Sequence, residues 1–129
     1  MLDTNIVSEL ARSPFGKCAQ KLRKIGVETL CISIVTSAEL RFGLMKRGSP
    51  KLYQQVDAIL NELDVIALGK PADEEYARLR VDLELKGIPI GPNDLLIAAH
   101  ALSIDATLVT ANIREFKRVD GLKVENWMA

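Results

Sequence analysis

The stretch Gly87-Ile88-Pro89-Ile90-Gly91-Pro92-Asn93-Asp94 leads directly into the apolar run Leu95-Leu96-Ile97-Ala98-Ala99-His100-Ala101-Leu102. Its two glycines and two prolines end a preceding polar helix and permit a sharp loop. Pro92 suits the first position of a new helix, where its missing N–H leaves no group unpaired. Asp94 then falls in the first turn, where unpaired N–H groups and the helix dipole favour a negative charge. Because the next residues are apolar on almost every face, we expect a buried helix with an ionised carboxylate at its start.

Asp94 on its own has a simpler interpretation, which is that it merely caps this helix. An acidic residue in a first turn is a common stabilising feature. Which interpretation holds depends on whether other acidic residues reach the same place.

The composition bounds the fold and excludes several classes of protein. With 129 residues, 48% of them apolar and 26% charged, the chain has the make-up of one globular domain, which we predict to span residues 1–129. The sequence has neither an apolar run that could span a bilayer nor a signal peptide, so we expect a cytoplasmic protein without a membrane segment. The 17 basic and 17 acidic side chains balance, so nucleic-acid binding would require basic residues gathered on one side.

Short apolar segments alternate with amphipathic segments along the chain. Met1-Leu2 is interpreted as the end of a first strand, and further strands are predicted at residues 29–33, 64–68, 107–110 and 122–127. Helices are predicted at residues 6–11, 15–25, 36–47, 51–63, 71–86 and 113–118, in addition to the helix that begins near Pro92. This alternation indicates an α/β domain with a mainly parallel sheet.

Acidic residues follow the predicted strands at the edge where parallel sheets bind ligands. Asp3 follows the first strand, Glu39 comes after the second, and Asp94 begins the buried helix. Thr36 and Glu39 also have the spacing of a capping box, which gives Glu39 a purely structural alternative. Two carboxylates about 4 Å apart repel by about 4 kcal/mol at an effective dielectric near 20. A divalent cation would resolve that repulsion, and ligands that are all oxygen favour Mg²⁺ or Mn²⁺ and phosphodiester hydrolysis.

Other chemistries lack their residues. His100 is the single histidine and lies off the Asp94 face by helical spacing, so we predict that it packs in the core and binds no zinc. Cys18 and Cys31 have no metal or redox spacing. No glycine-rich phosphate loop with a following lysine is present, which excludes a P-loop NTPase.

Four segments together resemble the motif set of PIN-domain ribonucleases. They are Met1-Leu2-Asp3-Thr4-Asn5, residues 32–40, Gly91-Pro92-Asn93-Asp94 and Thr110-x-Asn112-x-x-Glu115-Phe116. More narrowly, Gly87-x-Pro89-Ile90-Gly91-x-x-Asp94-x-x-Ile97-Ala98-x-His100-Ala101 is typical of VapC toxins of bacterial type II toxin–antitoxin pairs. The resemblance implies a PIN-like α/β/α sandwich with a central, mainly parallel, five-stranded sheet.

The resemblance also implies a metal-dependent endoribonuclease. Asp3, Glu39 and Asp94 match the acidic motif positions and would hold Mg²⁺ or Mn²⁺. The residues implied to support them by hydrogen bonds are Thr4, Asn5, Ser33 and Thr110. A fourth acidic position of the wider family is Asn112 here, and Glu115, one turn on, is the candidate for the missing charge.

The family further implies partners. Similar toxins cut tRNA or ribosomal RNA, and those closest in motif favour initiator tRNA. They form homodimers and bind a VapB-type antitoxin. They contact operator DNA only indirectly, through that antitoxin. The antitoxin tail fills a groove near the acidic site, which Phe42, Leu44 and Met45 would line if they are not ordinary core residues. Basic residues that would hold RNA phosphates are Lys17, Lys21, Arg23, Lys24, Arg41, Lys46 and Arg47, with Arg41 close to Glu39 in sequence.

Two other function classes stay open. A non-catalytic relative would bind the antitoxin and, through it, operator DNA, and it would show no toxicity without its partner. A receiver-like signalling module would need an aspartate at the end of the third strand, where this sequence has Leu68-Gly69. It would also need a lysine after the fifth strand, and none fits.

Overall fold

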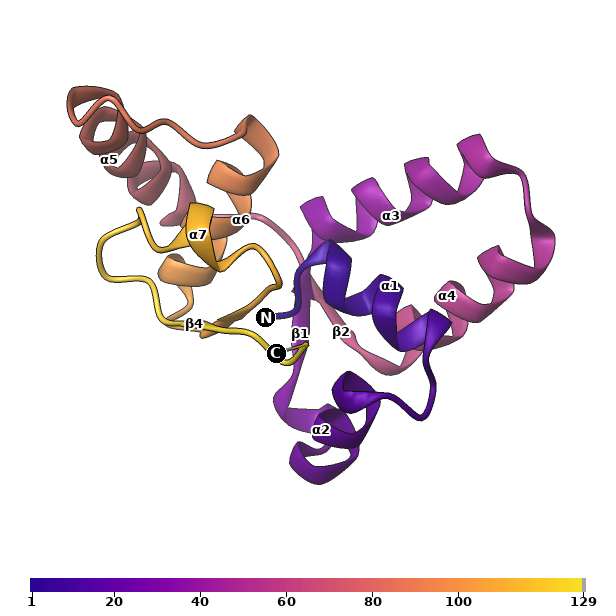
Figure 1. The fold of residues 1–129 in the computed structure, drawn as a ribbon. Coiled ribbons are helices and arrows are strands. Elements are labelled where there is room, and N and C mark those ends of the chain that lie inside the picture. The colour runs from indigo at the N-terminus through magenta and orange to yellow at the C-terminus, as the bar shows by residue number, and fades with distance from the viewer. Residues whose placement is uncertain (129) are drawn as a thin grey trace.

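The computed structural model describes residues 1–128, and four short strands occupy its centre (Figure 1). β1 (Cys31–Ser33) pairs in parallel with β2 (Asp64–Ile66), and β3 (Leu108–Val109) pairs in parallel with β4 (Val124–Glu125). The predicted mainly parallel arrangement is therefore present, as two strand pairs.

The start of the chain lies between these two strand pairs. The Leu2 N–H donates to the Cys31 carbonyl at 2.9 Å, and the Val109 N–H donates to the Met1 carbonyl at 2.8 Å. Leu2 forms one isolated parallel bridge with Val109. The predicted first strand is present as this bridge, and its hydrogen bonds join the two strand pairs, while the predicted count of five strands is not confirmed.

Helices flank the strands on both sides (Figure 1). One side carries α1 (Thr4–Arg12), α2 (Lys17–Ile25), α3 (Ile34–Arg47) and α4 (Pro50–Glu62), with the short 3-10 turn η1 (Val27–Thr29) before β1. The other side carries α5 (Ala72–Leu85), α6 (Pro92–Ser103) and α7 (Ile113–Phe116). As predicted, Pro92 opens α6 and Asp94 lies in its first turn. No helix within residues 1–128 has the length and apolar character to cross a bilayer.

The helices bury two apolar clusters. The first cluster, under α1 to α4, includes Ile6, Leu60 and Trp127, whereas the second, under α5 to α7, includes Leu79 and Phe116. Leu2 belongs to the first cluster and Met1 to the second. The two opening residues therefore connect both halves of the core.

The capping-box interpretation of Thr36 and Glu39 is wrong. Helix α3 begins at Ile34, because the Ser33 hydroxyl accepts the Val35 N–H at 3.1 Å and caps the helix three residues before Thr36. Thr36 is consequently an interior helical residue and is fully buried. Glu39 thus loses its structural explanation as part of a capping box.

Candidate acidic active site

Asp3 is a buried carboxylate with three hydrogen-bond donors. It is 4% exposed and stands at the cap of α1, where its Oδ1 accepts the Thr4 N–H at 2.8 Å. Its Oδ2 accepts the Thr110 hydroxyl at 2.8 Å and the Asn5 side-chain amide at 3.3 Å. These donors are neutral, so they fix the carboxylate in place without cancelling its charge.

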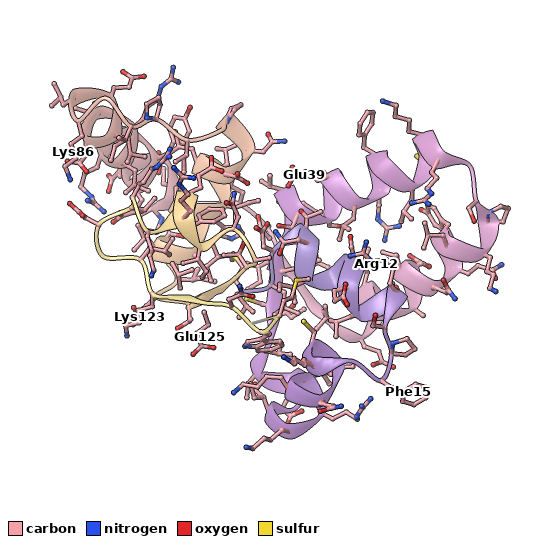
Figure 2. The ribbon with its side chains drawn as sticks, viewed as in Figure 1. Arg12, Phe15, Glu39, Lys86, Lys123 and Glu125 are labelled. Carbon is pink, nitrogen blue, oxygen red and sulfur yellow. The ribbon has the colours of Figure 1, made fainter. Side chains whose placement is uncertain are left out.

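Glu39 connects the starts of three helices. It lies in the N-terminal half of α3 (Figure 2), and its Oε1 accepts the Thr4 hydroxyl of α1 at 3.2 Å. Its Oε2 accepts the side-chain amide of Asn93, from the first turn of α6, at 3.3 Å. Glu39 therefore faces the place where α1, α3 and α6 all begin.

Glu115 is held against the start of α6. Its Oε1 accepts the Gly91 N–H at 2.9 Å, and its Oε2 accepts the Asn112 side-chain amide at 2.6 Å. A methyl group on Gly91 would lie 3.8 Å from Asp94 Oδ2 and 3.9 Å from Glu115 Oε1, so both carboxylates border that glycine. The structure thus places Glu115 beside Asp94, and Asn112, at the expected acidic position, holds it there.

Asp3, Glu39, Asp94 and Glu115, here called the acidic cluster, interact electrostatically. Burial, first, and then the charges of Asp3, Glu115 and Glu39 raise the pKa of Asp94 from 3.8 to about 7. A hydrogen bond with Glu115, which protonated Asp94 can donate, acts in the same direction. None of the ion pairs formed within residues 1–128 includes a member of the acidic cluster. The cluster therefore carries uncompensated negative charge.

The acidic cluster fits a divalent cation by donor type and by charge. Its donors are all oxygen atoms, which Mg²⁺ and Mn²⁺ prefer, and the raised pKa of Asp94 records repulsion that a cation would relieve. In their present arrangement, no three His, Cys, Asp or Glu side chains among residues 1–128 are close enough to hold a metal ion. Metal binding would thus require these side chains to adjust.

The predicted supporting residues divide into two groups. Thr4, Asn5 and Thr110 donate to carboxylates of the acidic cluster. Ser33 does not: its hydroxyl caps α3 and lies 2.7 Å from Nδ1 of His100, so the prediction of a supporting role for Ser33 finds no contact in the structure. His100 is 1% exposed, which matches its predicted packing role, and burial lowers its pKa.

Asn93 is a site residue that sequence reasoning missed. Its amide donates to Glu39, a contact across 54 positions of sequence. The available signal was its place directly before Asp94, in the first turn of a helix whose start was already assigned to the site.

The basic residues predicted near the acidic site have different surroundings. The Arg41 guanidinium donates to the Tyr53 hydroxyl at 2.8 Å and to Asp57 Oδ1 at 3.2 Å, which ties α3 to α4. Lys46 Nζ lies 5.9 Å from the centre of the Phe42 ring. Arg47 lines the groove described next. Contact of these residues with RNA stays a prediction.

A groove of about 270 Å³ runs between α1, α3 and α4 and reaches the acidic cluster at Thr4 and Glu39. Its other lining residues are Ser8, Ala11, Arg12, Leu40, Gly43, Leu44, Arg47, Leu52 and Val56. Leu44 lines this groove as predicted. Phe42 and Met45 are 68% and 74% exposed and do not line it, so they are not core residues, and their contact with an antitoxin stays a prediction.

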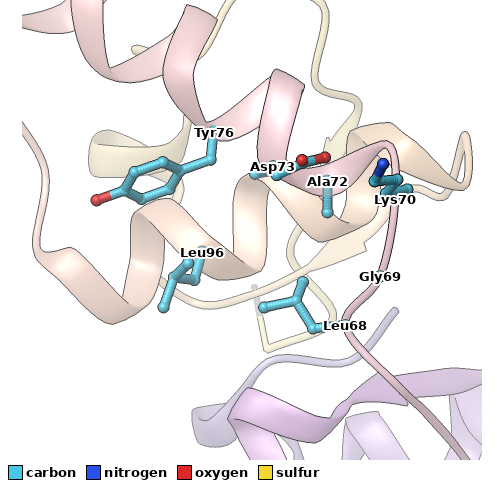
Figure 3. Close-up of a pocket in the computed structure, with 8 residues that line it drawn as sticks. Leu68, Gly69, Lys70, Ala72, Asp73, Tyr76 and Leu96 are labelled. Carbon is cyan, nitrogen blue, oxygen red and sulfur yellow. The ribbon is translucent and has the colours of Figure 1, made fainter.

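A second cavity, of about 350 Å³, is lined by none of the residues of the acidic cluster. It lies where α5 begins beside α6 (Figure 3). Leu68, Tyr76 and Leu96 give it mostly apolar walls, and Lys70 and Asp73 are the charged residues that line it. It holds no set of groups for acid–base or metal chemistry.

The PIN domain family matches residues 1–122. Ribonuclease VapC2 of Rickettsia felis is 41% identical over 98% of this chain and 96% of its own. The tRNA(fMet)-specific endonuclease VapC of Salmonella typhimurium is 32% identical over the same shares of the two chains.

Solved structures agree with the sequence matches. A chain of VapBC2 from Rickettsia felis, bound to a promoter DNA fragment, superposes with a TM-score of 0.89 at 38% identity, covering 98% of this chain and 97% of its own. A chain of DNA-bound VapBC from Salmonella typhimurium gives a TM-score of 0.88 at 32% identity, covering 98% and 96%. The chain therefore belongs to the PIN domain family and, within it, to the VapC ribonucleases.

Proposed function

We propose that this protein is the toxin of a toxin–antitoxin pair, a Mg²⁺- or Mn²⁺-dependent endoribonuclease that hydrolyses phosphodiester bonds of tRNA. The observation that carries the proposal is the convergence of Asp3, Glu39, Asp94 and Glu115 without a compensating cation. The relatives named as VapC ribonucleases, one of them specific for initiator tRNA, supply the substrate class.

In this proposal Asp3, Glu39 and Asp94 hold the metal, and Glu115 supplies the fourth carboxylate. A bound divalent cation lowers the pKa of a water molecule and offsets the charge that develops on the phosphate. Thr110 and the Thr4 N–H fix Asp3, while Asn93 and the Thr4 hydroxyl fix Glu39. Asn112 orients Glu115 toward the start of α6. Once the side chains had adjusted around a metal, hydrogen bonds of this kind would keep the ligands oriented during the reaction.

Cleavage of total tRNA, with initiator tRNA probed separately, tests the enzyme. Purified protein is incubated with Mg²⁺, with Mn²⁺ or with EDTA, beside an Asp94→Asn variant. We expect discrete fragments that require metal and that fall by about a hundredfold or more in the variant. Asp105→Asn is the matched control, because Asp105 lies beyond the other end of α6 at a positive φ of 53°, which asparagine tolerates. Equal cleavage by wild type and Asp94→Asn would defeat the assignment.

We further propose that the groove between α1, α3 and α4 receives the tail of a VapB-type antitoxin. Its walls combine Leu40, Leu44 and Val56 with the charged ends of Arg12 and Arg47, and one end opens at Glu39. A tail seated there would lie against the acidic cluster and block RNA. Operator DNA would be reached through the antitoxin, and we also predict a homodimer in the cytoplasm.

Gly43 offers a direct test of the groove. It lines the groove from within α3, and a Cβ added there meets no atom within 4 Å outside the helix backbone. Gly43→Phe should therefore fill the groove and weaken antitoxin binding while tRNA cleavage persists. Gly43→Ala is the matched control, which we expect to stabilise α3 by up to about 1 kcal/mol and to keep antitoxin binding. Unchanged antitoxin affinity in Gly43→Phe would place the tail elsewhere.

A further inference from the structure

A basic cavity of about 350 Å³ lies beside α2, remote from the acidic cluster. Its lining residues are Lys17, Gln20, Lys21, Lys24, Asn126 and Trp127. Helix α2 precedes the amino end of β1, whereas Ser33 and Glu39 follow the carboxyl end, so the two sites lie at opposite ends of that strand (Figure 1). Phe15, just before α2, and Glu39 are likewise far apart in Figure 2.

The three lysines of this cavity are exposed cations without an acidic partner in the described chain. None of the ion pairs within residues 1–128 includes Lys17, Lys21 or Lys24, and α2 contains no acidic residue. Two acidic residues lie close in sequence to the residues that line this cavity. Glu125 accepts the Trp127 indole N–H at 3.2 Å, and Glu28 lies in η1, after the end of α2. The cavity therefore has a net positive lining, although the chain as a whole has a formal net charge of zero.

The helix dipole does not explain this row of lysines as a whole, since it favours Lys24, in the last turn, but not Lys17. Their spacing places them on one face of α2, in a row about 10 Å long. Lys17 opens the helix, where the dipole disfavours a cation. Trp127 is 7% exposed and its N–H is already bonded, so its ring forms a wall and offers no free face for a base to stack on.

We propose that Lys17, Lys21 and Lys24 form a docking surface for the phosphate backbone of a structured RNA whose cleaved segment lies at the acidic cluster. This proposal rests on the proposed function, because it names where the same substrate is held. A row of ammonium groups without an available aromatic face fits phosphates and carries no base specificity. An extended, folded RNA such as tRNA presents phosphates on several sides, so it can contact this surface while another segment lies at the acidic cluster.

A charge-matched pair of triple variants tests the docking surface. One variant carries Lys17→Gln, Lys21→Gln and Lys24→Gln, and the control carries Lys51→Gln, Lys70→Gln and Lys123→Gln at exposed positions without ion pairs in residues 1–128. Affinities for an initiator tRNA transcript and for a five-nucleotide RNA are measured over a range of salt concentrations, with Asp94→Asn added to each protein to prevent cleavage. Glutamine keeps helix propensity close to that of lysine, and equal unfolding temperatures would verify the fold.

We expect the α2 variant to bind tRNA roughly tenfold more weakly or worse, with a slope of log affinity against log salt that is shallower by about two to three. Affinity for the five-nucleotide RNA should fall much less, because so short a chain makes few phosphate contacts, and the control should behave like the parent. Equal tRNA affinity and slope in the α2 variant, or an equal loss in the control, would overturn the proposal. So would a loss of antitoxin binding with tRNA binding intact. Failure of the proposed function would appear separately, as wild-type protein that cuts no RNA.

Discussion

At the scale of single residues, Asp3 and Asp94 show how one side-chain type is held in two different environments. Asp3 is more buried, yet it accepts three hydrogen bonds from neutral donors. Asp94 faces three other carboxylates, and burial and repulsion raise its pKa to about 7. A carboxyl group whose pKa is raised by burial and by neighbouring charges is a common feature of sites that bind cations or move protons.

Asp94→Asn should stabilise the metal-free protein at pH 8 by about 1–2 kcal/mol, after discounting for solvent screening. The pKa of Asp94 lies above its ordinary value of 3.8, so its contribution favours the folded state at low pH. That contribution is lost progressively as the pH rises from about 4 to about 7, and it levels off above. Urea unfolding in EDTA at pH 5 and pH 8 measures this. Asp105→Asn should change little, and a variant no more stable than wild type at pH 8 would contradict the electrostatic account.

Added metal should make wild type more stable than Asp94→Asn, which reverses the order of stability expected in EDTA at pH 8. Saturating Mg²⁺ or Mn²⁺ should raise the free energy of unfolding of wild type by about 2.7 kcal/mol at a hundred times the dissociation constant. Asp94→Asn should gain much less, because it has lost one of the charges that attract the cation. Thermal unfolding with added metal, followed by EDTA, measures both. An equal gain in the two proteins would indicate binding away from Asp94.

At the scale of elements, amphipathic spacing predicted the helices well, and α6 was predicted closely because Pro92 and the apolar run both mark it. The α3 boundary was missed because Thr36 and Ser33 are both good caps, and tertiary contact with His100 decides between them. Asp3 and Glu39 both contact Thr4, and Asp94 lies beside Glu115, but the role of these residues as a metal site stays a prediction. The contact between Glu115 and Gly91 could not be predicted from the sequence, because the two residues are 24 positions apart and no local pattern indicates that they meet.

The Ser33 cap gives a prediction at this scale. Ser33→Ala removes the cap of α3 and also leaves buried His100 without its hydroxyl partner, so we expect a cost of about 2–3 kcal/mol. Ser49→Ala is the matched control, because Ser49 caps α4 through the Leu52 N–H but has no buried partner. It should cost about 1 kcal/mol. Chemical denaturation compares the two, and similar losses would show that the His100 contact contributes nothing.

At the scale of the whole molecule, the two apolar clusters meet at Met1 and Leu2. A core joined in this way should unfold as one unit, in line with the predicted single domain. Leu79→Ala should cost about 2–5 kcal/mol, because Leu79 is fully buried between α5 and α6 in the second cluster. Trp127, the one tryptophan of the chain, reports on the first cluster. In Leu79→Ala, the unfolding transition followed by Trp127 fluorescence should therefore move to lower denaturant concentration, together with the transition followed by circular dichroism. A fluorescence transition at the wild-type midpoint would show that the two clusters unfold independently.

The position of Met1 and Leu2 between the strand pairs also has a consequence for biosynthesis. Their partner Val109 lies 107 positions beyond Leu2, and β4 comes later still. Asp3 draws its Thr110 hydrogen bond from that same late segment. On a ribosome, Met1 and Leu2 must therefore wait for residues more than a hundred positions later before the centre of the fold can close. A nascent chain that has not yet reached Thr110 would lack that hydrogen bond to Asp3, so we expect nuclease activity to appear only after this segment has been made.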